Sequence, residues 1–253
     1  MVRLVLLGAS NLTKGFAELI ETARHGFGGP VEIFAALGLG RSYGCASSVF
    51  GRGLPGIAPC ALWQALDREP ARPTYALLCD FGNDLPYGID VARILSWIEI
   101  CVVRLKSMNA RLQLTSLPIE RLTRLSRLEF DAFARVFYPD HRPEFAATLA
   151  CAHALDRGVR ELALQHGSRL VELTGASFGW DPIHLRSSAR RELWRDVVSA
   201  WGARPTPTDL RPTFSLRWRC FRVRPLHWSR FGEARTTPQP AALLADGTVL
   251  RLY

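Results

Sequence analysis

The sequence has no long apolar run, no paired-cysteine motif and little lysine. No stretch approaches the roughly 18 uncharged apolar residues that a membrane-spanning helix needs, so we expect no membrane span. The six cysteines lack C-x-x-C spacing, and Cys79 and Cys101 fall within apolar runs, which predicts reduced, buried thiols. The histidines other than His184 lie at no metal-ligand spacing from acidic residues or cysteines, so we assign no metal site and no cofactor.

The formal charge of the 253-residue chain is +9, and lysine contributes to it only at Lys14 and Lys106. A positive balance can indicate nucleic-acid binding, but these arginines are spread along the chain among acidic residues, which is typical of a solvated surface. With 48% hydrophobic and 22% charged residues, the composition is that of a water-soluble globular protein. The N-terminal apolar run lacks a small-residue cleavage site, so we see no secretory signal and expect a cytoplasmic location.

The strongest local signal lies at the start of the chain. Val2–Leu7 is an apolar run of the length of one buried strand, and Asn11 is expected to cap a helix that begins near Thr13. Ser10 then lies between the end of a strand and the start of a helix, where backbone N–H groups can stabilise a developing oxyanion. Ser10 is therefore a candidate nucleophile, although a turn serine that bonds its own backbone shows the same pattern.

Strands and helices alternate over the first 204 residues. The apolar periodicity predicts strands at about 2–7, 31–37, 74–79, 111–117 and 169–173, with helices at about 13–25, 56–66, 89–107, 125–137, 144–166 and 187–201. This alternation predicts a parallel sheet of about five strands with helices on both faces. We therefore expect an α/β domain over residues 1–204, with a three-layer α/β/α, flavodoxin-like fold.

The character of the sequence changes after residue 204, where several prolines indicate a linker. Residues 214–223 alternate between arginine and apolar side chains, which is typical of a strand with one solvated face and also of a nucleic-acid surface. Asp246-Gly247 between two apolar arms predicts a β-hairpin with a type I′ turn. We expect residues 205–253 to form a small β appendage.

Several polar side chains follow the predicted strands, and parallel pairing would bring them to one edge of the sheet. A hydrolytic serine needs a base within hydrogen-bond reach and a group that orients the base. Asp181 and His184 are three residues apart and can meet in these two roles. A backbone N–H of the loop 38–44, from Gly38 or Gly40, and the amide of Asn83 can donate to an oxyanion.

These blocks carry a resemblance to a known family. In order along the chain they are Gly8-Ala-Ser10, the glycine loop, Gly82-Asn-Asp84 and Asp181-x-x-His184. Over about residues 2–201, this arrangement resembles the SGNH (GDSL-like) hydrolase superfamily. The resemblance implies a serine hydrolase of the esterase, deacetylase or lipase-like kind, which forms an acyl-enzyme from a small-molecule ester or thioester.

The resemblance also implies a role for each matching residue. Ser10 would be the nucleophile and His184 the base, oriented by Asp181. The N–H groups of Ser10 and Gly40 and the side chain of Asn83 would form the oxyanion hole, with Gly38 as the second choice for the glycine. The chain departs from the family at Ala9, where Asp is usual, and at Phe81, where Gly is usual. The region after 204 lies outside the family pattern.

Other functions stay open at this stage. Gly40-Arg-Ser-Tyr-Gly44 fits the G-x-S-x-G nucleophile elbow of α/β-hydrolases, with Ser42 as nucleophile, but only one predicted strand precedes it. A basic nucleic-acid-binding module would show salt-sensitive binding and no ester turnover. An acyltransferase or an inactive binding relative would keep the fold. The sequence carries no signal for the oligomeric state or for the particular ester.

Overall fold

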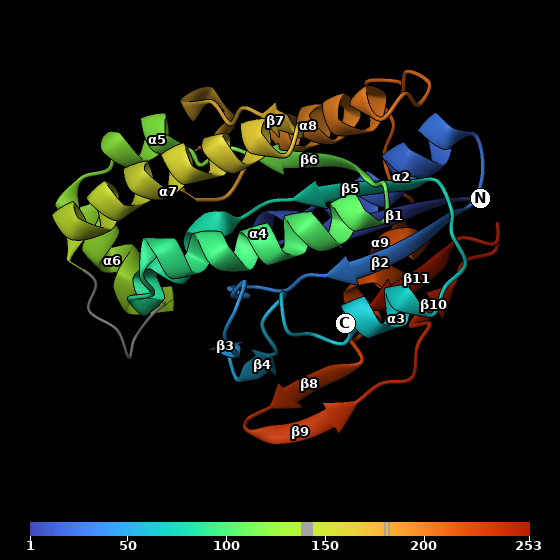
Figure 1. Ribbon diagram of the computed structural model, residues 1–253, viewed down its shortest axis with the longest axis horizontal. Helices are drawn as coiled ribbons and strands as arrows, with labels where there is room; N and C mark the ends of the chain where they lie inside the picture. Colours follow the sequence, from blue (N-terminus) through green and yellow to red (C-terminus); the bar gives the residue numbers. More distant parts are fainter. Residues whose placement is uncertain (138–143, 180, 182) are drawn as a thin grey trace.

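The fold is organised around one mostly parallel sheet (Figure 1). The computed structural model describes residues 1–137, 144–179, 181 and 183–253, and in this part the sheet has the order β10-β11-β2-β1-β5-β6-β7. Only the β10–β11 pair is antiparallel. The strands are β1 (Val2–Leu7), β2 (Val31–Ala36), β5 (Thr74–Leu78), β6 (Arg111–Thr115), β7 (Arg169–Val171), β10 (Ala242–Leu243) and β11 (Val249–Leu252).

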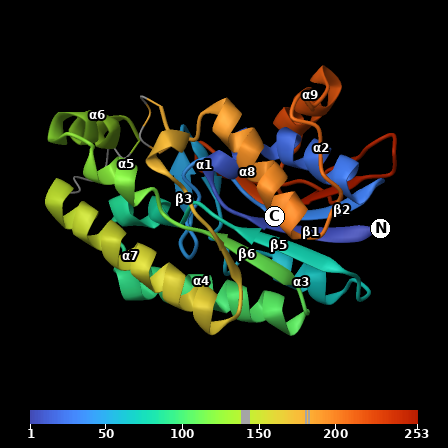
Figure 2. The same ribbon diagram turned by 90° about the horizontal axis from the view of Figure 1, so that it is seen from above.

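Helices cover both faces of this sheet (Figure 2). One layer holds α1 (Ser10–Lys14), α2 (Phe16–Phe27), α8 (Ser187–Ala200) and α9 (Phe214–Arg222). The other holds α3 (Leu62–Asp67), α4 (Val91–Ser107) and α7 (Phe145–Gln165), with α5 (Ile119–Thr123) and α6 (Arg127–Phe137) beside α7. Two 3₁₀ helices, η1 (Phe81–Tyr87) and η2 (Gly175–Ser177), follow strands. The expected three-layer α/β/α fold is confirmed.

The five strands predicted for residues 1–204 are all present, with ends that differ by at most two residues. Their order, β2-β1-β5-β6-β7, is the flavodoxin-like order. The helix expected at about 13–25 is interrupted at Gly15, where a Cβ atom would lie 2.3 Å from the indole nitrogen of Trp194. A side chain at position 15 would therefore clash with α8, which packs closely on the junction between α1 and α2.

The region after residue 204 differs from its prediction. Residues 214–223, expected as a strand, form helix α9, because Thr213 caps the first turn and Leu216, Cys220 and Val223 line one helical face. The β11 strand pairs in parallel with β2, so this region completes the main sheet. The boundary near residue 205 stays a prediction.

The predicted hairpin is present as β10–β11, but its turn is different. Leu244 and Thr248 are joined by a backbone hydrogen bond of 2.9 Å, which leaves three residues in the loop. Among the residues of this loop, only Gly247 has a positive φ, +90°, whereas a type I′ turn needs two residues with positive φ. The Asp246 carboxylate instead accepts a hydrogen bond from the Thr248 N–H and holds the longer loop.

A second, antiparallel sheet is formed by β3 (Ser47–Val49), β4 (Arg52–Leu54), β8 (His227–Arg230) and β9 (Glu233–Thr236), in the order β3-β4-β8-β9 (Figure 1). It joins the loop after β2 to the C-terminal region. In the part of the chain that the structure describes, no helix has the length and apolar character needed to span a bilayer.

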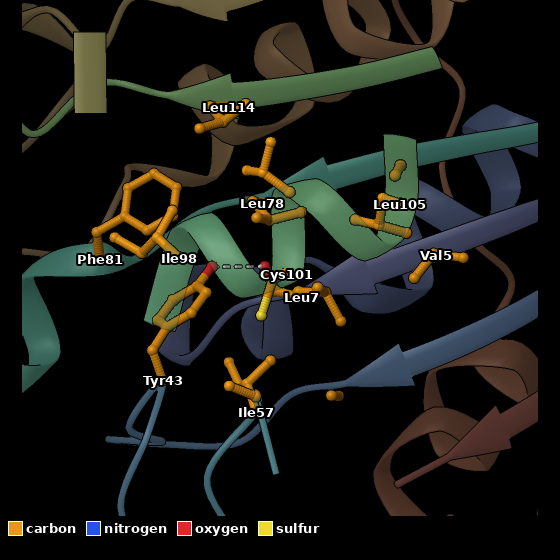
Figure 3. Close-up of a cluster of buried hydrophobic side chains, with 14 of the residues drawn as sticks. Val5, Leu7, Tyr43, Ile57, Leu78, Phe81, Ile98, Cys101, Leu105 and Leu114 are labelled. Carbon is orange, nitrogen blue, oxygen red and sulfur yellow. Dashed lines mark hydrogen bonds between the residues drawn. The ribbon is translucent and has the colours of Figure 1, made fainter. Parts of the chain in front are cut away.

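The core between the sheet and the α4 layer includes the fully buried phenol of Tyr43 (Figure 3). The Tyr43 ring packs 5.2 Å from the Phe81 ring, and its hydroxyl donates to the carbonyl of Cys79 at 2.9 Å and lies 3.3 Å from that of Leu7. Burial raises the pKa of Tyr43 well above its usual value, so the phenol stays protonated and keeps donating. Cys79 and Cys101 are buried free thiols, as expected.

Candidate active site

The candidate site lies at the carboxyl ends of β1 and β5. These strands are neighbours, and the chain turns to opposite sides of the sheet after them, which makes this the topological switch point where open α/β sheets bind ligands. Ser10 is the first residue of α1 directly after β1, and η1 with Asn83 follows β5. The position predicted for Ser10, between a strand and a helix N-terminus, is confirmed.

Helix α1 is capped from outside by Asp80. One carboxylate oxygen accepts hydrogen bonds from the N–H groups of Ala9, Asn11 and Leu12 at 2.8, 3.1 and 3.3 Å. Asp80 adopts a left-handed backbone conformation with φ +64°, which turns its side chain back to β1. The Ser10 N–H is left out of this set, and none of the described residues accepts from it. The cap expected from Asn11 is therefore wrong.

The Asn11 side chain instead bridges to the His184 loop. Its amide nitrogen donates to Asp80 Oδ1 and to the Ile183 carbonyl, both at 2.9 Å. Its amide oxygen accepts from the Leu185 N–H at 2.8 Å. The residue after the candidate nucleophile thus holds the peptide on both sides of the candidate base.

The predicted pair of Asp181 and His184 is in contact. Asp181 Oδ2 lies 2.5 Å from His184 Nδ1, and Asp181 Oδ1 accepts from the N–H groups of Ile183 and His184. Burial by itself would raise the pKa of Asp181, but hydrogen bonds and the charge of His184 outweigh it and lower the pKa. Asp181 is therefore a carboxylate at neutral pH and fixes the imidazole through Nδ1. Pro182, between them, lies outside the described residues.

The three donors predicted for the oxyanion hole each have a hydrogen that no described residue accepts. Asn83 Nδ2 donates one hydrogen to the Asp80 carbonyl at 3.0 Å and has a second hydrogen to give. Within the described ranges, neither the Ser10 N–H nor the Gly40 N–H has an acceptor. Gly40 has φ +60°, and its carbonyl accepts from the Tyr87 hydroxyl at 3.1 Å, which ties this loop to η1.

The glycine loop is also anchored through Asp84. Asp84 is fully buried, and its carboxylate accepts from the Tyr43 N–H at 2.9 Å and from the Ser42 hydroxyl. Burial raises the pKa of Asp84 to about 6. Because η1 carries both Asp84 and Asn83, the loop with Gly40 and the candidate oxyanion amide are fixed to one short helix.

The rival nucleophile has an unsuitable environment. Ser42 is fully buried, and its hydroxyl oxygen accepts from the N–H groups of Gly44 and Cys45 at 3.0 and 2.9 Å. The next element is strand β3, whereas a nucleophile elbow leads into a helix. The geometry therefore gives Ser42 the role of a turn residue.

An apolar cavity of about 120 Å³ opens at this corner. Ser10, Asn11, Asp80 and Asn83 lie at its polar end. Apart from Ser116 and Thr148, the rest of the lining is apolar. It comes from η1, α5, α6, α7 and nearby loops and includes Phe81, Leu85, Leu117, Leu122, Leu125, Phe130, Ala134, Phe145, Leu149, Ala152, Leu173 and Phe178. Phe81, the departure from the family pattern, forms part of this wall.

Two positioning residues were missed from the sequence. Asp80 precedes the Gly82-Asn-Asp84 block, and its only local signal is an acidic residue directly after a buried strand. Asn11 was assigned to the wrong partner. Both make their hydrogen bonds to residues far away in the chain, so no local spacing identifies them.

Comparison with known proteins identifies the fold. No model of a protein family and no curated protein matches this chain. The acetyl xylan esterase AlAXEase matches with a TM-score of 0.52 at 13% identity, covering 78% of this chain and 98% of that chain. A member of the lipolytic protein G-D-S-L family from Veillonella parvula DSM 2008 has a TM-score of 0.49 at 10% identity, covering 80% and 96%. The SGNH-hydrolase family esterase AlinE4 has a TM-score of 0.43 at 17% identity, covering 80% and 96%.

At these identities the likeness concerns the fold alone. The chain has the three-layer α/β/α fold that the acetyl xylan esterase also has. The three-layer fold that the resemblance to the SGNH (GDSL-like) hydrolases implies is therefore present.

Proposed function

We propose that this protein is a serine hydrolase that cleaves esters or thioesters through an acyl-enzyme intermediate. One observation carries the proposal: Asn11, next to Ser10, binds the carbonyl of Ile183 and the N–H of Leu185. This bridge sets the candidate base His184 beside the turn of the candidate nucleophile, although 174 residues separate Ser10 from His184 in sequence.

The proposed roles are those that the resemblance implies, and the contact between Asp181 and His184 supports them. His184, with Nδ1 held by Asp181, takes the proton of the Ser10 hydroxyl on Nε2 while the serine oxygen attacks the ester carbonyl. The N–H groups of Ser10 and Gly40 and the Asn83 amide donate to the oxyanion. His184 then gives its proton to the leaving alcohol or thiol, and water hydrolyses the acyl-enzyme by the same route.

The cavity supports an apolar acyl group as the substrate's acid part. Its volume of about 120 Å³ is roughly ten times that needed by one water molecule, so it is larger than an acetyl group requires. The cavity wall formed by Leu122, Leu125 and Phe130 offers no hydrogen-bond partner to a sugar. A flexible hydrocarbon chain, in contrast, can fill an apolar cavity of this kind. We therefore propose esters of medium-chain or longer fatty acids as substrates.

A fluorophosphonate probe tests the nucleophile. The purified protein should be labelled on Ser10, labelling should be lost in Ser10→Ala, and Ser42→Ala should be labelled like the wild type. Labelling that survives Ser10→Ala and is lost in Ser42→Ala would assign the reaction to the G-x-S-x-G segment.

A series of p-nitrophenyl esters tests the acyl group. We expect kcat/KM to rise from acetyl to medium-chain esters and the product to be the free acid. A maximum at acetyl would contradict the assignment of the cavity, and transfer of the acyl group to an added alcohol in place of water would identify an acyltransferase.

A further inference from the structure

Helix α9 carries three exposed aromatic rings. We call Phe214, Trp218 and Phe221 the aromatic ridge; their side chains are 81%, 51% and 71% exposed. Neighbouring rings are stacked, with centroids 6.5 and 5.9 Å apart and interplanar angles of 11° and 26°. The opposite face of α9 packs on α2 through Leu216 and Val223. The ridge is thus a fixed feature of the surface.

The sequence around the ridge is rich in arginine. From residue 210 to residue 232 the sequence contains six arginines and no acidic residue. Arg217 and Arg219 donate to the carbonyls of Pro212 and Leu243, and Arg222 lies over the Trp218 ring at 5.9 Å. In the described part of the chain, no carboxylate forms a salt bridge with these three arginines.

We propose that α9 binds the surface of a membrane that contains anionic lipids. A helix that presents aromatic side chains together with arginines lies in the lipid interface, with the rings among the upper acyl chains and the guanidinium groups at the phosphates. The ridge and its arginines have this composition. The overall charge of +9, which ester hydrolysis does not require, adds attraction to such a surface.

Two other occupants fit less well. Stacking of a nucleic-acid base on Trp218 would compete with the contacts of this ring to Phe214, Phe221 and the guanidinium of Arg222. A two-fold contact with a second copy would place the arginines of one ridge against those of the other, and like charges oppose such a contact. An anionic lipid surface accommodates the aromatic rings among its acyl chains and attracts the arginines through its phosphates.

Co-sedimentation of the full chain with vesicles tests the proposal. We expect binding to vesicles of phosphatidylglycerol and phosphatidylcholine, weak binding to phosphatidylcholine alone, and weakening by salt. Phe214→Ser with Trp218→Ser should reduce binding at least tenfold. Arg217→Gln, Arg219→Gln and Arg222→Gln together should do the same.

Matched controls remove the same groups elsewhere. Phe231→Ser deletes another exposed ring, and Arg68→Gln, Arg127→Gln and Arg157→Gln together delete three other exposed arginines. These controls should bind vesicles like the wild type. All variants should keep the wild-type unfolding temperature and the turnover of a soluble ester, because none of the changed residues lines the cavity.

Other outcomes would overturn the proposal. The proposal is wrong if the protein binds vesicles without preferring phosphatidylglycerol, or if the control variants lose as much vesicle binding as the ridge variants. It is also wrong if vesicle binding is unchanged in both the aromatic and the arginine variant of the ridge. Binding of an oligonucleotide through α9 without vesicle binding would identify a nucleic-acid surface. A dimer that the ridge variants dissociate would identify a second copy as the occupant. Because vesicle binding is measured without substrate, its result is independent of the proposed hydrolysis.

Discussion

Asn11 holds His184 by the main chain on both of its sides, through the Ile183 carbonyl and the Leu185 N–H. The same amide also bonds the Asp80 carboxylate, so its two donors and its oxygen are all used. A short side chain next to the candidate nucleophile thereby ties this turn to the loop that carries the candidate base. This makes Asn11 a positioning residue whose removal should affect turnover more than substrate binding.

We expect Asn11→Ala to lower kcat by about 10²-fold with a small change in KM, because a displacement of about 1 Å between serine and base has an effect of this size. Gln113→Ala is the matched control, since it removes a buried amide that donates to the Val197 carbonyl far from the cavity. Steady-state kinetics and denaturant unfolding of both variants provide the measurement. If the two variants lose stability alike and also lose kcat alike, Asn11 has no positioning role.

The Asn83 side chain is expected to act on the transition state. Asn83→Ala should lower kcat by about 10²–10³ and leave KM nearly unchanged, since an oxyanion-hole donor stabilises charge that develops during the reaction. Asn109→Ala removes an amide outside the cavity and should have wild-type kinetics. If kcat is unchanged in Asn83→Ala, the Asn83 side chain serves only the turn, through its hydrogen bond to the Asp80 carbonyl.

Asp181 and His184 should behave as one unit. His184→Ala should lower kcat/KM at least as much as Asp181→Asn, and the double variant should lose hardly more than His184→Ala alone. The physical reason is that the carboxylate acts only through the imidazole that it holds at 2.5 Å. Single-turnover and steady-state rates of the three variants form the cycle. Independent, multiplicative losses would contradict the assigned pair.

The wall of the cavity offers a selective test of the acyl group. Ala134 lies on α6 in the cavity lining, whereas Ala132 on the same helix is exposed. Ala134→Leu should lower kcat/KM for medium-chain esters by about tenfold or more and leave acetyl esters little changed, because the added methyl groups occupy the chain's space. Ala132→Leu should leave both unchanged. A uniform loss for all esters would indicate distortion of α6 and not a shorter pocket.

Asp84 should make the stability depend on pH. Its pKa is raised from 3.8 to about 6, so between these values the folded state binds more protons than the unfolded state. The free energy of unfolding therefore falls as the pH rises from about 4 to about 6, by up to about 3 kcal/mol from this group.

Asp84→Asn should remove that part of the pH dependence, because the amide is neutral throughout and its oxygen can still accept from the Tyr43 N–H. Urea unfolding of both proteins between pH 4 and pH 7 measures the difference. Asp67→Asn, at an exposed carboxylate, serves as the control. A parallel pH profile for wild type and Asp84→Asn would show that Asp84 does not titrate in this range.

The main fold could be predicted because its signals are local. Runs such as Val2–Leu7 and Val31–Ala36 are buried at nearly every residue, and each is apolar apart from one charged side chain, Arg3 or Glu32, which pair with each other. The same holds for the helices with an apolar stripe, such as α4. The positions of Ser10 and Asn83 follow, because they come directly after strands β1 and β5.

What could not be predicted depends on distant contacts. Residues 214–223 combine arginines with large apolar side chains at spacings that fit both a strand and a helix, and packing on α2 selects the helix. Asp80 caps a helix that begins 70 residues earlier in the chain. The turn between β10 and β11 has three residues since Asp246 bonds Thr248, which a two-residue signal does not reveal.

The placement of β11 has a consequence for how the chain is made. β2 pairs with β11, which follows it by more than 200 residues, so a growing chain carries an open strand edge at β2 until β11 has been made. The loop with Gly40 is affected as well, because the buried Arg41 guanidinium donates to the Tyr253 carbonyl. The main-sheet strands β1, β2, β5, β6 and β7 can therefore pair before β11 is made. The loop after β2 gains its hydrogen bond to Tyr253 only after β11 has paired with β2.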